Sequence, residues 1–301
     1  MRGKVGIVSR RLLTKLYAWG YNVNSTSPAQ IGTDNWLATS GGEYHLLAIR
    51  SDGKLFAFGD NTYGQVGDGT TTYRTSPVQI GTSDWLAVSA GGFHSLAIRS
   101  DGKLFGWGAN NYGQVSGSME NTISSPAQIG TSNWLAVSAG NFHSLAIRSD
   151  GKLFAFGDNS YGQLGDGTTT LRTSPVQIGT SDWLAVSAGK FHSLAIRSDA
   201  KLFGWGNNVY GQVTGSTATT ILSPTQIGTS DWVLISAGGY HSMAITNDKK
   251  LFAFGQNTNG QLGDGTTTNR NSPTQISGTG EWIAADAGGY NSIAIIQQAV
   301  T

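Results

Sequence analysis

The chain has 301 residues, of which 12% are charged, and its formal net charge is +1. This near-neutral balance excludes the basic field that nucleic acids require and the acidic tail that would attract a basic partner. Cysteine is absent, which excludes disulfides and thiolate metal sites, and no apolar run reaches the roughly 18 residues of a membrane span. The 43 glycines and 6 prolines indicate many tight turns.

The first segment, residues 1–15, precedes the regular part of the chain. Its basic side chains are Arg2, Lys4, Arg10, Arg11 and Lys15. It contains no apolar core of signal-peptide length, so we interpret it as a basic arm or the remnant of a leader. The compartment stays open between the bacterial cytoplasm and export. Residues 16–301 are expected to form one domain, because no linker interrupts them.

A short apolar motif of the form LFAFG or LFGWG recurs along this domain. Its copies begin at Leu16, Leu55, Leu104, Leu153, Leu202 and Leu251. Consecutive copies lie 49 residues apart, except for the first interval, which is 39 residues. A fixed period of this size predicts a propeller, a solenoid or an array.

The repeat spanning Trp85–Pro126 shows how one unit folds. It contains four strand-like runs, WLAVSA, FHSLAIR, LFGWG and SPAQIG, and the Asp-Gly turn of SDGK joins the second to the third. The runs are apolar on both alternating faces, which is typical of a sheet that is buried on both sides. No segment shows a helical period, so we expect a four-stranded antiparallel propeller blade.

The number of strands predicts how the ring closes. The first two runs occur six times, opening at Trp36, Trp85, Trp134, Trp183, Trp232 and Trp282. The last two runs also occur six times, so the chain begins with the second half of a blade and ends with the first half. We therefore expect an all-β, six-bladed propeller closed by N- and C-terminal strands that share one blade.

The sequence also contains a longer repeat that spans two blades. The motif carries tryptophan in alternate units, at Trp19, Trp107 and Trp205, and phenylalanine between them, at Phe58, Phe156 and Phe254. The larger unit is thus a 98-residue pair of blades, used three times. Pseudo-threefold symmetry and internal duplication follow.

Four motifs recur around the chain: G-x-N-x-Y-G-Q-[VL], S-P-x-Q-I, S-A-G-x-[FY]-H-S-[LM]-A-I and [SN]-D-x-K-L-F-x-[FW]-G. Together they resemble the regulator of chromosome condensation repeat, over about residues 16–298. The resemblance implies a β-propeller that binds a protein through one face of its disc. Members of the family include a eukaryotic nucleotide-exchange factor for a small GTPase and a bacterial secreted inhibitor of β-lactamase. The best-known members have seven blades, and this chain carries no insertion resembling the wedge of the exchange factor.

One histidine falls in each unit except the last, which has Asn291 instead. The set is His45, His94, His143, His192 and His241. Such a ring could hold a metal or an anion, or each side chain could hydrogen-bond the backbone of its own AGG turn. Asparagine suits the second task and is a poor zinc ligand, and ligands spaced one per blade lie too far apart for a tetrahedral site. We interpret these residues as structural turn histidines.

The loop GDGTTT recurs in alternate units and contains Asp68, Asp166 and Asp264. Calcium would need about six oxygen ligands, whereas each loop offers at most two carboxylates and the third has Gln256 in place of one of them. Asp-Gly turns explain the loop without a metal. We therefore expect no metal and no cofactor.

Strand direction predicts two different faces. The AGG turns and the long loops between third and fourth strands share one face, the long-loop face, and the SDGK hairpins occupy the opposite hairpin face. Four tyrosines precede Gly-Gln in the long loops: Tyr63, Tyr112, Tyr161 and Tyr210. They could either present an exposed aromatic ring to a partner or pack against a neighbouring blade. We take them, together with the three GDGTTT aspartates, as the candidate partner-binding residues, and the alternating charges of the hairpin face as a solvated surface.

The first unit is the one asymmetry of the ring. Its loop is reduced to YNVNSTSPAQ, which leaves either a docking notch on the long-loop face or a gap that the basic arm fills. The leading hypothesis for the whole chain is a non-catalytic scaffold that binds a protein partner through the long-loop face. The alternatives are a lectin-like carbohydrate-binding module, a structural subunit of a larger assembly, and nucleotide exchange on a small GTPase. No nucleophile motif or phosphate loop indicates an enzyme.

Overall fold

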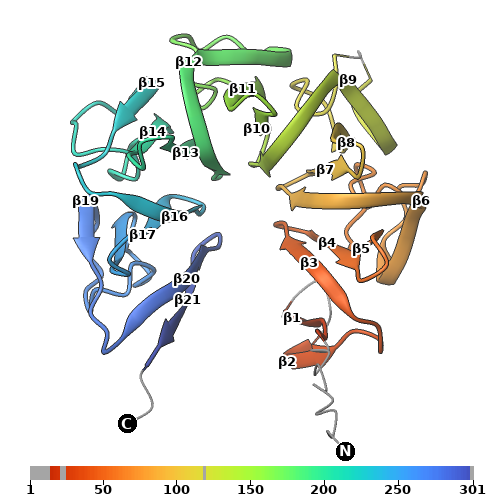
Figure 1. Ribbon diagram of the computed structural model, residues 1–301, viewed down its shortest axis with the longest axis horizontal. Helices are drawn as coiled ribbons and strands as arrows, with labels where there is room; N and C mark the ends of the chain where they lie inside the picture. The colour runs from red at the N-terminus through yellow and green to blue at the C-terminus, as the bar shows by residue number, and fades with distance from the viewer. Residues whose placement is uncertain (1–13, 21–24, 118–119, 299–301) are drawn as a thin grey trace, which may run out of the picture.

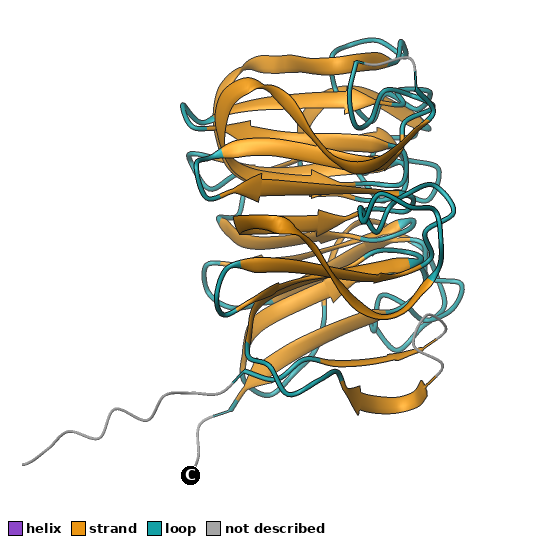
Figure 2. Ribbon diagram, turned by 90° about the vertical axis from the view of Figure 1, so that its right-hand side faces the viewer, coloured by secondary structure: helices purple, strands orange, loops and turns teal. Residues whose placement is uncertain are grey.

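The computed structural model describes residues 14–20, 25–117 and 120–298. Every regular element in these ranges is a β-strand, arranged around a central axis (Figure 1). In the side view the strands run across the thickness of a disc, with short turns at one face and longer loops at the other (Figure 2). The expected all-β propeller is thereby confirmed. No helix in the described ranges is long and apolar enough to cross a membrane.

Five complete blades follow one another, and several long strands belong to two of them. The first three blades use β3 (Trp36–Gly41), β4 (His45–Arg50), β5 (Lys54–Gly59), β6 (Arg74–Ala90), β7 (His94–Arg99), β8 (Lys103–Ala109), β9 (Thr122–Ala139), β10 (His143–Arg148), β11 (Lys152–Gly157) and β12 (Arg172–Ala188). The fourth and fifth use β13 (His192–Arg197), β14 (Leu202–Asn207), β15 (Thr220–Gln226), β16 (Trp232–Ala237), β17 (His241–Thr246), β18 (Leu251–Gly255) and β19 (Arg270–Gln275). Because β6, β9 and β12 each end one blade and begin the next, four blades form a continuous 13-stranded sheet.

The apolar residues of the motif are buried on both sides of each blade. In β7, Leu96 and Ala97 point to opposite faces, yet both side chains are fully buried. The hydrophobic clusters lie between blades: one contains Leu47 from β4, Trp85 from β6 and Trp107 from β8. The core is therefore a series of interblade layers, which explains why the runs show no hydrophobic-in, polar-out alternation.

Two side-chain hydrogen bonds recur between each blade and the next. His45 Nε2 lies 2.7 Å from Ser95 Oγ of the following blade, and the amide of Ala90 donates to Ser40 Oγ at 3.0 Å. The histidine contact repeats four times, with His94, His143, His192 and His241 at 2.9–3.0 Å from Ser144, Ser193, Ser242 and Ser292. The structural role is thus a lock between blades, whereas the sequence suggested a bond to the backbone of the histidine's own turn. That difference arises because only the tertiary structure sets the spacing of neighbouring blades.

The two ends of the ring form separate half-blades. Strands β1 (Tyr17–Gly20) and β2 (Ser25–Gln30) make one two-stranded sheet, and β20 (Glu281–Ala287) and β21 (Ser292–Gln297) make another (Figure 1). The closing blade expected from the strand count is therefore not formed within the described residues. At this junction the lock residues are replaced on both sides, by Asn291 in the histidine position and Leu46 in the serine position.

The structure describes the short first unit and the basic arm only in part. Residues 1–13 of the basic arm and residues 21–24 of the shortened loop lie outside the described ranges. Thr14 Oγ1 donates to the carbonyl of Trp36, and Lys15 Nζ donates to the carbonyl of Thr33. Thr33 lies in the turn that precedes β3, and Trp36 is the first residue of that strand, so Thr14 and Lys15 lie at the hairpin face.

Candidate protein-binding face and central channel

The long loops are held in shape by their own repeated amide side chains. Asn61 Oδ1 accepts from the amide of Val66, and its Nδ2 donates to the carbonyls of Thr70 and Thr72. Gln65 Oε1 accepts from the amide of Tyr63 at 2.8 Å. The same bonds recur in the loops of Asn159 and Asn257. The loops are therefore rigid supports for the residues at their tips.

The three GDGTTT aspartates act inside these loops. The side chains of Asp68, Asp166 and Asp264 are 5–10% exposed and pair with Arg74, Arg172 and Arg270, respectively. Burial raises the pKa of Asp264, but hydrogen bonds from Thr266 and Arg270 outweigh it and hold that pKa at about 2. These carboxylates therefore pair with arginines of their own loops, and a contact between them and a partner stays a prediction.

The four tyrosines combine the two roles that the sequence left open. Tyr63, Tyr112 and Tyr161 are 38–40% exposed. Each also packs one edge against an aromatic ring of the next blade, in the pairs Tyr63–Phe93, Tyr112–Phe142, Tyr161–Phe191 and Tyr210–Tyr240, with centroids 5.3–5.6 Å apart. A side chain that is held by its neighbour and still half-exposed loses little conformational entropy on binding.

Sequence reasoning missed the second half of this surface. Phe93 stacks on Phe142 at 5.2 Å and contacts Tyr44 at 5.3 Å, while Phe191 contacts Tyr240 at 5.8 Å. We call the combined set the aromatic collar; its members are Tyr44, Tyr63, Phe93, Tyr112, Phe142, Tyr161, Phe191, Tyr210 and Tyr240. The signal was present in the sequence as the aromatic residue before each histidine. Only the ring arrangement shows that it meets the loop tyrosine of the preceding blade.

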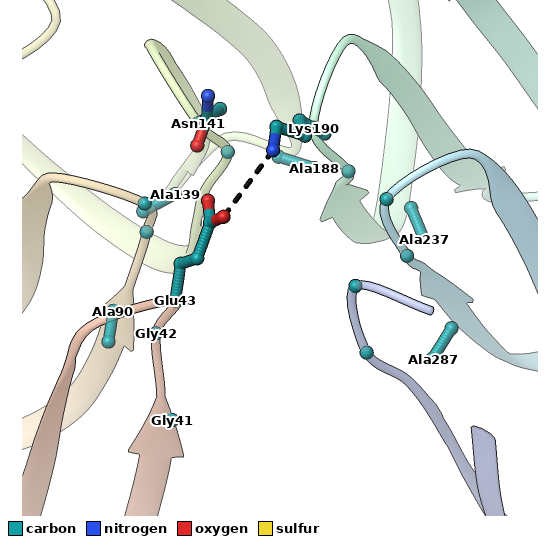
Figure 3. A pocket seen from close by; sticks show the side chains of 18 of the residues that line it. Gly41, Gly42, Glu43, Ala90, Ala139, Asn141, Ala188, Lys190, Ala237 and Ala287 are labelled. Carbon is teal, nitrogen blue, oxygen red and sulfur yellow. Dashed lines mark hydrogen bonds and ion pairs between the residues drawn. The ribbon is translucent and has the colours of Figure 1, made fainter. Parts of the chain in front are cut away.

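The collar surrounds a central channel built from the AGG turns. Its volume is about 490 Å³, and its wall consists mostly of glycine and alanine from all six turns (Figure 3). Neighbouring turns are joined by main-chain bonds such as Gly92 N to Gly140 O at 3.0 Å. A methyl group at Gly140 would come within 2.4 Å of His143 Cε1, so the close approach of turn and imidazole requires glycine there.

Two charged side chains lie across the channel. Lys190 Nζ is 3.4 Å from Glu43 Oε1, and the two residues come from turns on opposite sides of the ring (Figure 3). Tyr44 Oη donates to Glu43 Oε1 at 3.1 Å, and the charge of Glu43 raises the pKa of that phenol. The polar side chains among the described residues that line the channel are Glu43, Asn141, Lys190, Tyr290 and Asn291.

The histidines below the channel wall are neutral at ordinary pH. Burial lowers the pKa of His45, His143 and His241 to about 4, and of His94 and His192 to about 3. Ser95 Oγ donates to the carbonyl of Gln65 at 2.8 Å, so it accepts from His45 and the proton lies on Nε2 of that imidazole. In the described part of the chain, no group of three histidine, aspartate or glutamate side chains could share a metal ion.

The hairpin face neutralises its own charges and exposes leucines. Arg50 pairs with Asp52 at 2.7 Å and lies 4.7 Å from the centre of the Phe56 ring. The same pairing recurs at Arg99, Arg148 and Arg197. One leucine in each of the first four blades is 62–68% exposed near this face: Leu37, Leu86, Leu135 and Leu184. Sequence reasoning did not select these leucines, because each follows a buried tryptophan within an apolar run.

The fold and this face define a repeat-built β-propeller with an aromatic rim. The family model described as the Regulator of chromosome condensation (RCC1) repeat matches residues 52–98, 101–147, 150–196, 199–245 and 248–295. A second model of the same repeat matches five segments between residues 38 and 261. The chain belongs to this family.

Solved structures of propellers are similar to the chain. Prp20p from Saccharomyces cerevisiae, described with its binding to Gsp1p and histones, is 20% identical with a TM-score of 0.85; the match covers 93% of this chain and 78% of Prp20p. Human WBSCR16 is also 20% identical, with a TM-score of 0.66 over 91% of this chain and 90% of its own. No curated protein sequence matches the chain. At this level of identity the likeness establishes the fold.

Proposed function

We propose that the chain is a non-catalytic scaffold that binds a protein partner through the aromatic collar on its long-loop face. The observation that carries this proposal is the pairing of each loop tyrosine with an aromatic ring of the next blade. It produces a pre-organised surface of half-exposed rings, the composition that is enriched at the energetic centres of protein interfaces. The printed description of Prp20p, which binds Gsp1p and histones, is consistent with a protein as the partner.

The charges at the channel mouth add a polar element to this surface. Glu43 and Lys190 are exposed by 37% and 27%, so a partner could separate this ion pair at low cost. An apolar or aromatic side chain at the tip of a partner's loop would enter the channel, while its flanks rest on the collar. Near-identical blades would suit a partner that is itself repetitive or symmetric.

The test compares two sets of substitutions on opposite faces. The collar variant carries Tyr63→Ala, Tyr112→Ala, Tyr161→Ala and Tyr210→Ala. The matched control carries Leu86→Ser, Leu135→Ser and Leu184→Ser, which remove exposed apolar groups from the hairpin face. Both are immobilised beside the unchanged protein and exposed to lysate of the source organism, and retained proteins are identified and measured again as purified pairs by calorimetry.

We expect a stoichiometric protein that the unchanged chain and the leucine variant retain and the tyrosine variant loses. Loss with the leucine variant alone would move the interface to the hairpin face. Retention of no protein, with binding to a glycan array that depends on the tyrosines, would replace the proposal with the carbohydrate-binding alternative.

A further inference from the structure

The residue after the two small residues of each AGG turn lies at the mouth of the channel, and it differs from unit to unit. In ring order these residues are Glu43, Gly92, Asn141, Lys190, Gly239 and Gly289. The repeats that begin at Leu55 and Leu153 differ at only five of 49 positions, and one of the five has Lys190 in the place of Gly92. Because three of the six turns form with glycine, the turn itself does not require the side chains of the other three.

Asn141 has polar groups without partners at this mouth. The residue is only 5% exposed, yet no other described residue hydrogen-bonds its side-chain amide. Within the described ranges, its main-chain N–H also lacks the bond that joins the other turns: the amides of Glu43, Gly92, Lys190 and Gly239 each donate to a carbonyl of the next turn at 3.0–3.3 Å. Buried donors are normally satisfied, so these N–H groups are available to a ligand in the channel.

Lys190 adds a cation to these donors. It lies on the turn that follows the turn of Asn141, and both side chains reach the same opening, which Glu43 enters from the other side (Figure 3). An ammonium group and amide N–H groups together suit a carboxylate. Glu43 Oε1 lies 3.4 Å from Lys190 Nζ and also accepts from Tyr44 Oη, so it keeps a donor when Lys190 binds another anion. The charges of Glu43 and Lys190 cancel, so a ligand with one carboxylate and one N–H donor leaves neither charge uncompensated.

The channel beside these polar groups suits an apolar side chain. Its wall carries one alanine from each of five turns: Ala90, Ala139, Ala188, Ala237 and Ala287. Its volume of about 490 Å³ falls in the range of about 300–1,000 Å³ that is usual for small-molecule sites. A space of this size that is lined by methyl groups favours an apolar ligand group over a polar one, because only the apolar group gains by leaving water.

We propose that the channel binds an apolar α-amino acid residue that has a free carboxylate. Lys190 and the amide groups of Asn141 bind the carboxylate, Glu43 accepts from the α-nitrogen, and the side chain lies against the alanine wall. A free amino acid and the C-terminal residue of a polypeptide both carry this chemistry. The inference goes beyond the proposed function, because it requires no contact with the aromatic collar.

The first experiment measures ligand binding by isothermal titration calorimetry. The probes are L-phenylalanine and the tripeptide glycylglycylphenylalanine, and each is compared with its C-terminal amide. We expect saturable one-to-one binding of at least one acid, weakened about tenfold or more in its amide, since the charge-assisted hydrogen bonds are lost. Tighter binding of phenylalanine identifies a free amino acid as the ligand, and tighter binding of the tripeptide identifies a polypeptide C-terminus. Equal binding of acid and amide, or no saturable binding of either acid, overturns the proposal.

Two glycine substitutions test the residues that bind the carboxylate. Lys190→Gly and Asn141→Gly each introduce the residue that three other turns already have, so both variants should fold. We expect each to weaken the tighter acid about tenfold. The matched control is Lys250→Ala, which removes a lysine that pairs with Asp248 at 2.7 Å on the hairpin face and should leave binding unchanged. Unchanged binding in either glycine variant overturns the proposal.

A pair of alanine substitutions tests the position of the Asn141 amide. A methyl group at Gly92 would overlap Asn141 Oδ1, so Gly92→Ala should push this flexible side chain aside and weaken binding. Gly41→Ala is the matched control, because its methyl meets no atom within 4 Å and the other five units have alanine at this position. Equal binding by these two variants overturns the proposal.

The tyrosine variant of the collar separates this proposal from the proposed function. Its four substituted tyrosines do not line the channel. We therefore expect this variant to bind the acid as tightly as the unchanged protein does, whether or not it retains a protein partner. Loss of the acid in the tyrosine variant overturns the assignment of the ligand to the channel.

Discussion

Acidification should unfold this protein through its buried histidines. The pKa of each lock histidine is lowered from 6.5 to about 3–4, because burial disfavours the charged imidazole. Between these values the unfolded chain binds protons that the folded chain does not. The histidines therefore do not reduce the free energy of unfolding above about pH 6.5. Below that pH the free energy of unfolding falls as the pH decreases towards 4.

The size of the loss follows from the number of locks. At pH 5 an unfolded histidine is almost fully protonated, which costs the folded state about 2 kcal/mol for each site, or about 10 kcal/mol for five. A loss of that size is comparable with the whole stability of a typical domain, about 5–15 kcal/mol. We expect the fold to be lost near pH 5.

The assay is urea unfolding followed by tryptophan fluorescence at several pH values between 7.5 and 5. The pH dependence of the unfolding constant should correspond to an uptake of about five protons near pH 5.5. The variant His94→Asn replaces one lock histidine with asparagine, the residue that the last unit already has at Asn291. It should reduce the proton uptake on unfolding by one proton. A free energy of unfolding that is equal at pH 7.5 and pH 5.5 would refute the buried, neutral histidines.

The remaining predictions concern packing and surface charge, and urea unfolding at pH 7.5 measures all of them. Gly67→Ala should cost about 3 kcal/mol, since its methyl would meet the indole of Trp107 at 2.6 Å, whereas Gly81→Ala, also at positive φ but with open space, should cost about 1 kcal/mol; equal costs would contradict the close approach. Trp107→Phe should cost about 2 kcal/mol through the lost bond to Gln65 and the volume left empty, and a neutral effect would contradict that bond. Lys190→Ala should change stability by less than about 1 kcal/mol, because its ion pair is solvated; a larger loss would show that the pair supports the channel.

Much of the fold could be predicted because the residues within each repeat indicate its strands and turns. The Asp-Gly turns set the hairpins, and runs that are apolar on both faces indicate blades buried between neighbours, as Leu96 and Ala97 are. The loop glutamines could be assigned to loop structure for the same reason: Gln65 bonds a residue only two positions away. Interactions of this kind can be predicted because the residues that make them are close together in the sequence.

The candidate surface depended on contacts between blades, which no single repeat contains. The partners of the lock histidines lie 50 or 51 residues away, and the collar joins loop tyrosines to rings of the following blade. The aspartates of GDGTTT looked available in the sequence, yet folding of the loop commits them to arginines six residues on.

The sequence by itself determined the blade, its repetition and the two faces, because strand pairing within a blade uses residues close along the chain. Only the tertiary structure decided how the blades are spaced around the axis and which side chains meet between them. That spacing depends on the interblade locks and on side-chain volumes in every layer between blades. The contacts between lock histidines and serines, and between the rings of the collar, therefore appear only when neighbouring blades are in place.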